Sequence, residues 1–163
     1  MRAAAVLSDH VKEAIECWKA RFPEGRERSV IVSALHAVQH ENGGHLPAEQ
    51  MHAVAEYLNL PAIQVYEIAT FYSMFQTQPV GRHNVAICTN ISCMLRGADA
   101  IVEHVESRLG IEVGESTADG RIYLKREEEC LAACCGAPMM MVDHKYHENL
   151  TTEQVDEILD GLD

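Results

Sequence analysis

Two closely spaced groups of cysteines are the feature that most constrains what this 163-residue chain can fold into. Cys88 and Cys93 have four residues between them, Cys130 and Cys134 have three, and 36 residues separate the two groups. Cys135 adjoins Cys134, so spacing alone leaves open which of these two belongs to the second pair. Inside a cell, cysteines grouped in this way indicate metal binding or redox chemistry rather than disulfide bonds.

Each group follows a segment with the character of a β-strand. Residues 83–88 contain an apolar run at 85–87, and residues 122–128 alternate in polarity. Strands that lie side by side bring the turns after them to one end of the sheet, where four thiolates can surround one metal centre. Thiolate is the form that binds metal, so the site has to offset negative charge. Backbone N–H groups of short loops, and of a helix starting near Gly97, can do this.

The spacing favours an iron–sulfur cluster over zinc but leaves both open. Structural zinc sites most often use a Cys-x2-Cys knuckle, whereas two irons are a wider target that suits the longer gaps seen here. Thioredoxin-type dithiol chemistry needs a Cys-x-x-Cys motif, which the sequence lacks. Neither cysteine loop contains a histidine, which argues against a Rieske centre, and nine histidines make any Cys–His pairing unspecific.

The N-terminal half predicts one helix after another over residues 8–75. Ser8 and Ser29 are each placed to cap a helix whose apolar residues recur at helical spacing. Pro47 and Pro61 are each placed at a first helical position, where a missing N–H is harmless. This half is therefore predicted to be a helical bundle.

The character of the sequence changes in the breaker-rich stretch 77–81, so two domains are expected, residues 1–78 and residues 79–163. The second half predicts, in order, strand 83–88, helix 98–109, an Asp119-Gly120 turn, strands 122–128 and 139–142, and a last helix with Thr151 and Gln154 as a capping box. A parallel pair joined by a helix, then an antiparallel hairpin and a closing helix, is the minimal thioredoxin-like arrangement. The fold class is thus α+β.

Charge and hydropathy limit the partners. With 13 basic and 25 acidic residues the formal net charge is −12, so phosphates of nucleic acid and anionic lipid head groups repel the chain. No stretch approaches the roughly 20 apolar residues of a membrane span, and residues 1–7 lack the features of a secretory signal or a transit peptide. We expect an intracellular protein without nucleic-acid binding or direct membrane insertion.

Two cysteine-containing segments, 85–97 and 129–138, resemble the small 2Fe–2S subunit of respiratory NADH:quinone oxidoreductase, which is the E subunit of bacterial complex I. Segments 69–75 and 44–47 look like the helical N-terminal half of the same family. The resemblance covers nearly the whole chain. It implies a thioredoxin-like α/β ferredoxin domain behind a helical domain.

The resemblance also implies the ligands. The family's four cluster ligands fall on Cys88, Cys93, Cys130 and Cys134, which leaves Cys135 as a non-ligand. Family members often have glycine where this chain has Ala132.

By the same resemblance, the chain is an electron-carrying subunit of an NADH dehydrogenase, with one 2Fe–2S cluster lying to the side of the main chain of clusters that leads to quinone. FMN and NADH are implied to bind a partner subunit, consistent with the lack of a Gly-x-Gly-x-x-Gly motif here. The implied location is cytoplasmic, peripheral to the inner membrane through the complex. The alternatives are the equivalent small subunit of an NAD-linked hydrogenase or formate dehydrogenase, and a zinc-stapled interaction module without a redox role.

Four other side chains are given ordinary structural roles. Cys17 is predicted to be a packed small apolar residue of its helix. Phe71, Tyr72 and Phe75 are predicted to pack inside the helical domain, with a docking face as the alternative.

Overall fold

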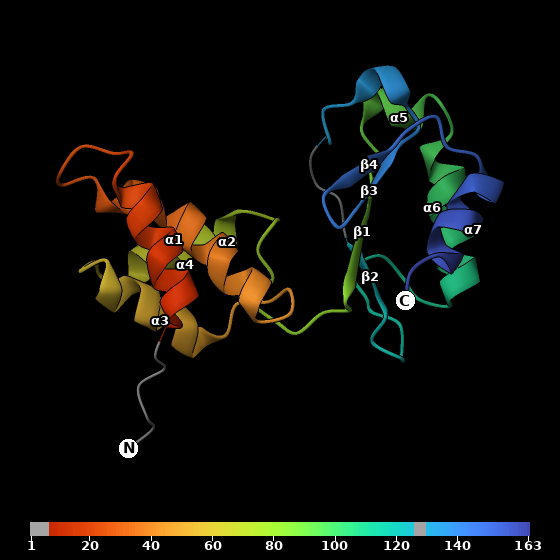
Figure 1. The fold of residues 1–163 in the computed structure, drawn as a ribbon. Helices are drawn as coiled ribbons and strands as arrows, with labels where there is room; N and C mark the ends of the chain where they lie inside the picture. The colour runs from red at the N-terminus through yellow and green to blue at the C-terminus, as the bar shows by residue number, and fades with distance from the viewer. Residues whose placement is uncertain (1–6, 126–129) are drawn as a thin grey trace. The chain divides into compact units, whose positions relative to one another are not determined.

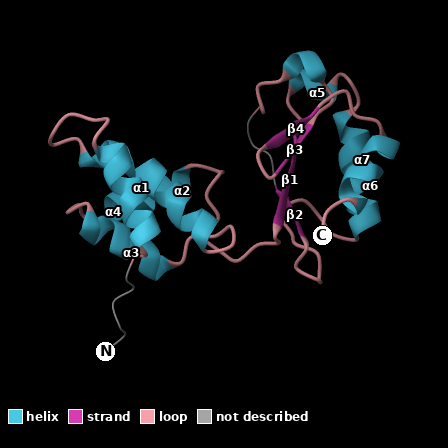
Figure 2. Cartoon of the chain, in the orientation of Figure 1, coloured by secondary structure: helices cyan, strands magenta, loops and turns pink. Residues whose placement is uncertain are grey.

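The computed structural model describes residues 7–125 and 130–163. The chain divides into two compact units, Met1–Pro79 and Val80–Asp163, which are taken one at a time below (Figure 1). The first unit is helical and the second contains all the strands (Figure 2). The predicted α+β fold class is confirmed. None of the helices in the described residues is long and apolar enough to cross a membrane.

The first unit is a bundle around one apolar core. Its helices are α1 (Asp9–Lys19), the 3-10 helix η1 (Glu27–Val30), α2 (Ile31–Glu41), α3 (Ala48–Tyr57) and α4 (Ala62–Phe71). Ser8 caps α1 as predicted, because its hydroxyl accepts a hydrogen bond from the Val11 N–H at 3.1 Å. Ile15 of α1, Leu35 of α2 and Val54 of α3 are each completely buried in the shared core.

Three local predictions in this unit are wrong. Ser29 does not cap α2, because it lies inside η1 and the chain continues from Val30 into α2 without an extended residue. Along this continuous helical segment, Val30 and Ile31 are both buried in the core. Pro47 and Pro61 are N-cap residues with ψ of 141° and 133°, so α3 and α4 each begin one residue later than predicted.

Aromatic residues in the first unit are less buried than predicted. Phe75 lies in the core, but Phe71 is 78% exposed and Tyr72 is 43% exposed. Phe71 and Tyr72 instead pack edge to face against each other, with ring centroids 5.0 Å apart. Cys17 is exposed on α1, so its prediction as a packed apolar residue is also wrong.

The second unit is a four-stranded mixed sheet with helices. Its elements are β1 (His83–Ile87), α5 (Ile91–Met94), α6 (Ala98–Leu109), β2 (Ile122–Lys125), the 3-10 helix η2 (Cys134–Gly136), β3 (Met140–Val142), β4 (Lys145–His147) and α7 (Thr152–Asp160). The strand order is β2-β1-β3-β4. β1 pairs parallel with β2 and antiparallel with β3, and β3 forms a hairpin with β4. The parallel pair joined by a helix is confirmed, whereas the strand order and the fourth strand, β4, were not predicted.

One face of the sheet carries the core of this unit. Val85 of β1 lies between Leu124 of β2 and Val142 of β3 in register, and all three are buried in one cluster. Residues from α6 and α7, including Val105 and Val155, complete the same cluster, so both helices cover this face (Figure 1). Alternate residues of each strand therefore point at the helices, as period-two side-chain geometry requires.

The ends of the helices follow the predicted signals. Thr151 and Gln154 form the capping box at the start of α7. Gly97 precedes α6 with φ of 89°, a left-handed conformation that glycine adopts without steric cost.

At the predicted turn, Gly120 has φ of 68° and its N–H donates to the Thr117 carbonyl at 2.8 Å. The turn leads directly into β2, which begins at Ile122.

Because β1 and β2 are adjacent and parallel, the segments after them leave from the same edge of the sheet. Cys88 follows β1 directly. Residues 126–129, which include the predicted continuation of the second strand, lie outside the described residues. Cys130 is the first described residue after that gap.

The Gly81 position gives a test of the parallel pairing. A Cβ added at Gly81 would lie 2.5 Å from the Ile122 carbonyl carbon and 2.7 Å from the Tyr123 nitrogen, both backbone atoms of β2. We expect Gly81→Ala to destabilise the second unit by about 1–3 kcal/mol, because the strands have to separate. Amide hydrogen exchange of β1 and β2 measures the loss of protection.

Gly161→Ala is the matched control for this substitution. An added Cβ at Gly161 meets only the Glu157 and Ile158 carbonyl oxygens at 3.5 Å, an ordinary contact. Its φ of −80° suits any residue, so we expect protection to stay the same or rise slightly. Equal exchange rates in the Gly81→Ala and Gly161→Ala variants would contradict the close approach of residue 81 to β2.

Candidate metal centre

The first cysteine pair is built by the turn after β1. The Cys88 N–H donates to the Met139 carbonyl at 3.1 Å, so β1 remains tied to the β3 segment up to the first candidate ligand. The chain then enters the short helix α5, which Asn90 caps by accepting a hydrogen bond from the Ile91 N–H at 2.8 Å. Cys93 lies on α5. Cys88 and Cys93 are each only 1% exposed.

The second pair lies on the loop that leads to β3. The Sγ atoms of Cys130 and Cys134 are 3.4 Å apart, and both residues are exposed. The Ala132 N–H donates to Cys130 Sγ at 3.3 Å, which holds this sulfur beside the loop backbone. Cys134 begins η2, and the Ala137 N–H donates to its carbonyl at 3.4 Å. The loop therefore turns back on itself so that these two sulfurs face each other.

The two pairs interact through Cys93. Burial raises the pKa of the Cys93 thiol to about 11, and a hydrogen bond with Cys88 and the charges of Cys88 and Cys130 act in the same direction. The backbone N–H of Met139 partly opposes this rise in pKa. The thiols of Cys88 and Cys130 are thus both close enough to Cys93 to affect its ionisation. A metal centre here has to displace the Cys93 proton when it binds.

The donor atoms of the site are arranged as pairs of thiols. Two thiolates about 2.3 Å from one tetrahedral metal ion lie about 3.8 Å apart, and Cys130 and Cys134 are close to that separation at 3.4 Å. Across residues 7–125 and 130–163, no three or more His, Cys, Asp or Glu side chains gather tightly enough to hold a single ion. The thiols come together as pairs, and a pair on each iron is the requirement of a 2Fe–2S cluster with four cysteine ligands.

The remaining cysteines have no such arrangement. Cys135 is exposed beside Cys134, but the described sulfur–sulfur contact of this loop joins Cys130 to Cys134. This geometry favours Cys134 over Cys135 as the partner of Cys130. Cys17 lies on α1 in the first unit and is exposed.

Sequence reasoning missed the short helix α5, which contains Cys93. α5 is only four residues long, too short to give a periodic pattern, although Asn90 followed by Ile91 is a capping signal. It presents Ile91 at 67% exposed and Leu95, just after its end, at 77% exposed. Two large apolar side chains thus lie on the surface of the first cysteine loop.

Ala132 has an unusual backbone conformation. Its φ is +62°, in the left-handed region that disfavours residues with a Cβ by roughly 1–2 kcal/mol. The Ala132 N–H donates to Cys130 Sγ at 3.3 Å. Ala132 is thus a left-handed position between Cys130 and Cys134, where glycine would be accommodated without steric cost.

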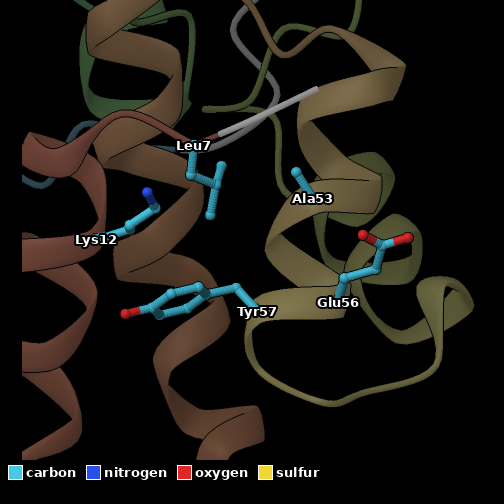
Figure 3. Close-up of a pocket in the computed structure, with 5 residues that line it drawn as sticks. All are labelled: Leu7, Lys12, Ala53, Glu56 and Tyr57. Carbon is cyan, nitrogen blue, oxygen red and sulfur yellow. The ribbon is translucent and has the colours of Figure 1, made fainter. Parts of the chain in front are cut away.

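A separate pocket lies in the first unit and does not have the character of a cofactor site. It encloses about 280 Å³ between the start of α1 and α3, and its lining residues are Leu7, Lys12, Ala53, Glu56 and Tyr57 (Figure 3). Small-molecule sites usually have a volume of about 300 Å³ or more, and a few of their polar groups point at the ligand. Here the Tyr57 hydroxyl donates to Glu16 at 3.0 Å instead. No cysteine lines the pocket.

The strain at Ala132 predicts the effect of a substitution. We expect Ala132→Gly to stabilise the metal-free, reduced chain by up to about 1 kcal/mol, because glycine adopts a positive φ without steric cost. Ala133→Gly is the matched control. Ala133 has φ of −115°, so glycine there only adds freedom to the unfolded chain and should destabilise by about 0.4–1 kcal/mol. Urea unfolding measures both changes, and stabilisation by neither variant or by both would contradict the assigned conformation.

Comparison with known proteins agrees with this fold. Residues 15–163 match the thioredoxin-like 2Fe–2S ferredoxin family. An E subunit of NADH-quinone oxidoreductase from Rhizobium meliloti is 44% identical over 152 residues, which cover 93% of this chain and 88% of that protein. The E subunit of NADH-quinone oxidoreductase from Rickettsia conorii is 39% identical over 142 residues, which cover 87% and 84% of the two chains.

A solved structure shares the fold. The crystal structure of an NAD+-reducing NiFe-hydrogenase in the air-oxidised state superposes on 77% of this chain with a TM-score of 0.66. The sequence identity is 23%, and the match covers 22% of the hydrogenase chain. At this identity the likeness concerns the fold alone. The match over nearly the whole length and the two relatives show that this chain belongs to the thioredoxin-like 2Fe–2S ferredoxin family.

Proposed function

We propose that this chain is the electron-transferring E subunit of an NADH–quinone oxidoreductase and carries one 2Fe–2S cluster on Cys88, Cys93, Cys130 and Cys134. The observation that carries this proposal is the pairing of thiols in each cysteine segment, because the Cys130 and Cys134 Sγ atoms are 3.4 Å apart and the Cys93 thiol is hydrogen-bonded with Cys88. Residues 79–163 form the proposed cluster-carrying domain, and residues 1–78 form the proposed helical domain.

The host complex is proposed from the named relatives. Proteins named as E subunits of NADH-quinone oxidoreductase are 37–44% identical over most of this chain. A mitochondrial NADH dehydrogenase flavoprotein 2 of Dictyostelium discoideum is 38% identical over 143 residues, which cover 88% of this chain and 58% of that protein. These identities support the respiratory enzyme over a hydrogenase or a formate dehydrogenase as the host.

A 2Fe–2S cluster supplies one-electron redox chemistry when it is bound. The chain's own residues provide the surroundings for this chemistry. Cys88 and Cys93 lie in an apolar cluster with Ala98, Ala137 and Met139, which excludes water from one side of the site. On the other side the Ala132 N–H donates to Cys130 Sγ, and a hydrogen bond of this kind stabilises negative charge on sulfur. The exposed pair, Cys130 and Cys134, is the side on which an electron-transfer partner can approach.

The partner is proposed to be a flavin- and NADH-binding subunit of the same complex. The sequence has no Gly-x-Gly-x-x-Gly motif, so NADH and FMN are expected to bind the partner rather than this chain. The partner's flavin takes two electrons from NADH, and this chain exchanges one electron with that flavin. We place the subunit on the cytoplasmic side, peripheral to the inner membrane through the complex. Co-purification with a protein that contains FMN tests this arrangement.

The Cys134 and Cys135 pair gives a matched test of the ligand set. We expect Cys134→Ala to lose most of the iron and the visible absorption of the anaerobically purified chain, because one iron loses a thiolate. Cys135→Ala removes an adjacent, equally exposed thiol and should keep both. Absorption spectra and iron analysis of the two variants measure this difference. Loss of colour in the Cys135→Ala variant alone would contradict Cys134 as a ligand.

The charge of the chain predicts a low reduction potential. Two ferric ions, two sulfides and four thiolates carry −2 together, so the loaded chain has a formal charge of −14, counting −12 for the protein with neutral cysteines. Adding an electron to this acidic body is unfavourable, and we expect a midpoint near the plant-type ferredoxin value of about −400 mV. Electron paramagnetic resonance during a redox titration measures the midpoint. A positive value is incompatible with the prediction.

A further inference from the structure

The two thiol pairs of the site differ in their access to solvent. Cys88 and Cys93 are each 1% exposed, whereas Cys130 and Cys134 are both exposed. The Sγ atoms of the exposed pair are 3.4 Å apart. A disulfide bond needs about 2.05 Å, so a shift of about 1.4 Å between two surface side chains is enough to join them. A small oxidant can therefore reach one pair of thiols and not the other.

We propose that Cys130 and Cys134 form a reversible disulfide with each other when the chain is without its cluster, with a low-molecular-weight disulfide such as oxidised glutathione as the oxidant. The proposal concerns the chain before cluster insertion and is separate from electron transfer. Only its consequence for cluster insertion rests on the proposed function.

The reaction takes two thiol–disulfide exchange steps. One of the two thiolates attacks a sulfur of the small disulfide, which forms a mixed disulfide and releases one small thiol. The second thiolate of the pair then attacks the protein sulfur of the mixed disulfide and releases the other small thiol. Two protein thiols are oxidised to one disulfide, the small disulfide is reduced to two thiols, and the two protons leave with those thiols.

The loop geometry selects Cys134 over Cys135 as the partner of Cys130 in the disulfide. The Ala132 N–H holds Cys130 Sγ at 3.3 Å, and the Cys130 sulfur faces that of Cys134. Cys135 is also exposed but has no described contact with Cys130 Sγ. Cys17 is also exposed, on α1 of the first unit, and offers a site for a mixed disulfide.

The disulfide has a direct consequence for loading of the site. It removes two of the four proposed ligands, because a metal binds thiolate and not disulfide sulfur. The chain then needs a dithiol reductant before it can accept iron. The oxidation state of Cys130 and Cys134 would thus follow the ratio of thiols to disulfides around the protein.

The experiment uses the full chain, freed of metal by a chelator, reduced, and then incubated with oxidised glutathione near neutral pH. Remaining thiols are blocked with N-ethylmaleimide, and the protease-digested protein is mapped by mass spectrometry. We expect one disulfide, between Cys130 and Cys134. Cys88 and Cys93 should both be alkylated after denaturation. Cys135→Ala should keep the link and Cys134→Ala should lose it, and far-ultraviolet circular dichroism checks that both variants are folded.

A second measurement separates this proposal from the proposed function. Oxidised and reduced chains are supplied with ferrous iron and sulfide, and the growth of visible absorption is followed. We expect the oxidised chain to gain absorption at least about tenfold more slowly, and dithiothreitol to restore the rate. A link from Cys130 to Cys135, a link between Cys88 and Cys93, or glutathione adducts alone would overturn the inference. Failure of the fully reduced chain to take up iron would instead contradict the proposed function.

Discussion

The parallel pairing of β1 with β2 is the interaction on which the rest of the second unit depends. It runs in register from His83 opposite Ile122 to Ala86 opposite Lys125, and it places Val85 between the buried residues of its two neighbouring strands. A parallel pair needs a crossover, and α6 supplies it while covering the core face. The same pairing sends the segments that carry the cysteines out of one edge of the sheet. A shift of one residue in this register would turn Val85 and Ile87 away from the face that carries the core of this unit.

Much of this architecture can be predicted from local patterns in the sequence. The bounds of α6 and the capping box of α7 follow from periodicity and capping residues, and the structure confirms them. The predicted order of strand, helix, strand, strand and helix is contained in the observed order, but it lacks α5, η2 and β4. The errors arise where tertiary contacts override a local signal. Ser29 has the chemistry of a cap, but Val30 and Ile31 are buried by a continuous helical path. Apolar spacing gives no information about whether another element covers the outer side of α4, so Phe71 was predicted to be buried although it is exposed.

The candidate site is only partly accessible to sequence reasoning. Spacing and the preceding strands predict that four cysteines meet, and the resemblance to a family selects Cys134, but which iron each thiol binds does not follow from either. The unequal exposure of the two pairs also needs the structure, because it depends on how Ala98, Ala137 and Met139 pack around Cys88 and Cys93. Ala132 illustrates the same limit. Alanine gives no sequence signal for a left-handed backbone, yet Ala132 has φ of +62° and its N–H contacts Cys130 Sγ.

The central claim is that thiols from two separate turns hold a pair of irons. Its most direct test is chemical analysis of iron, zinc and acid-labile sulfide in the full chain, prepared without oxygen and with a dithiol reductant present. The account predicts two irons and two sulfides for each chain, together with a visible absorption that bleaches on reduction with dithionite. One zinc for each chain, with no iron, no sulfide and no colour, would contradict it.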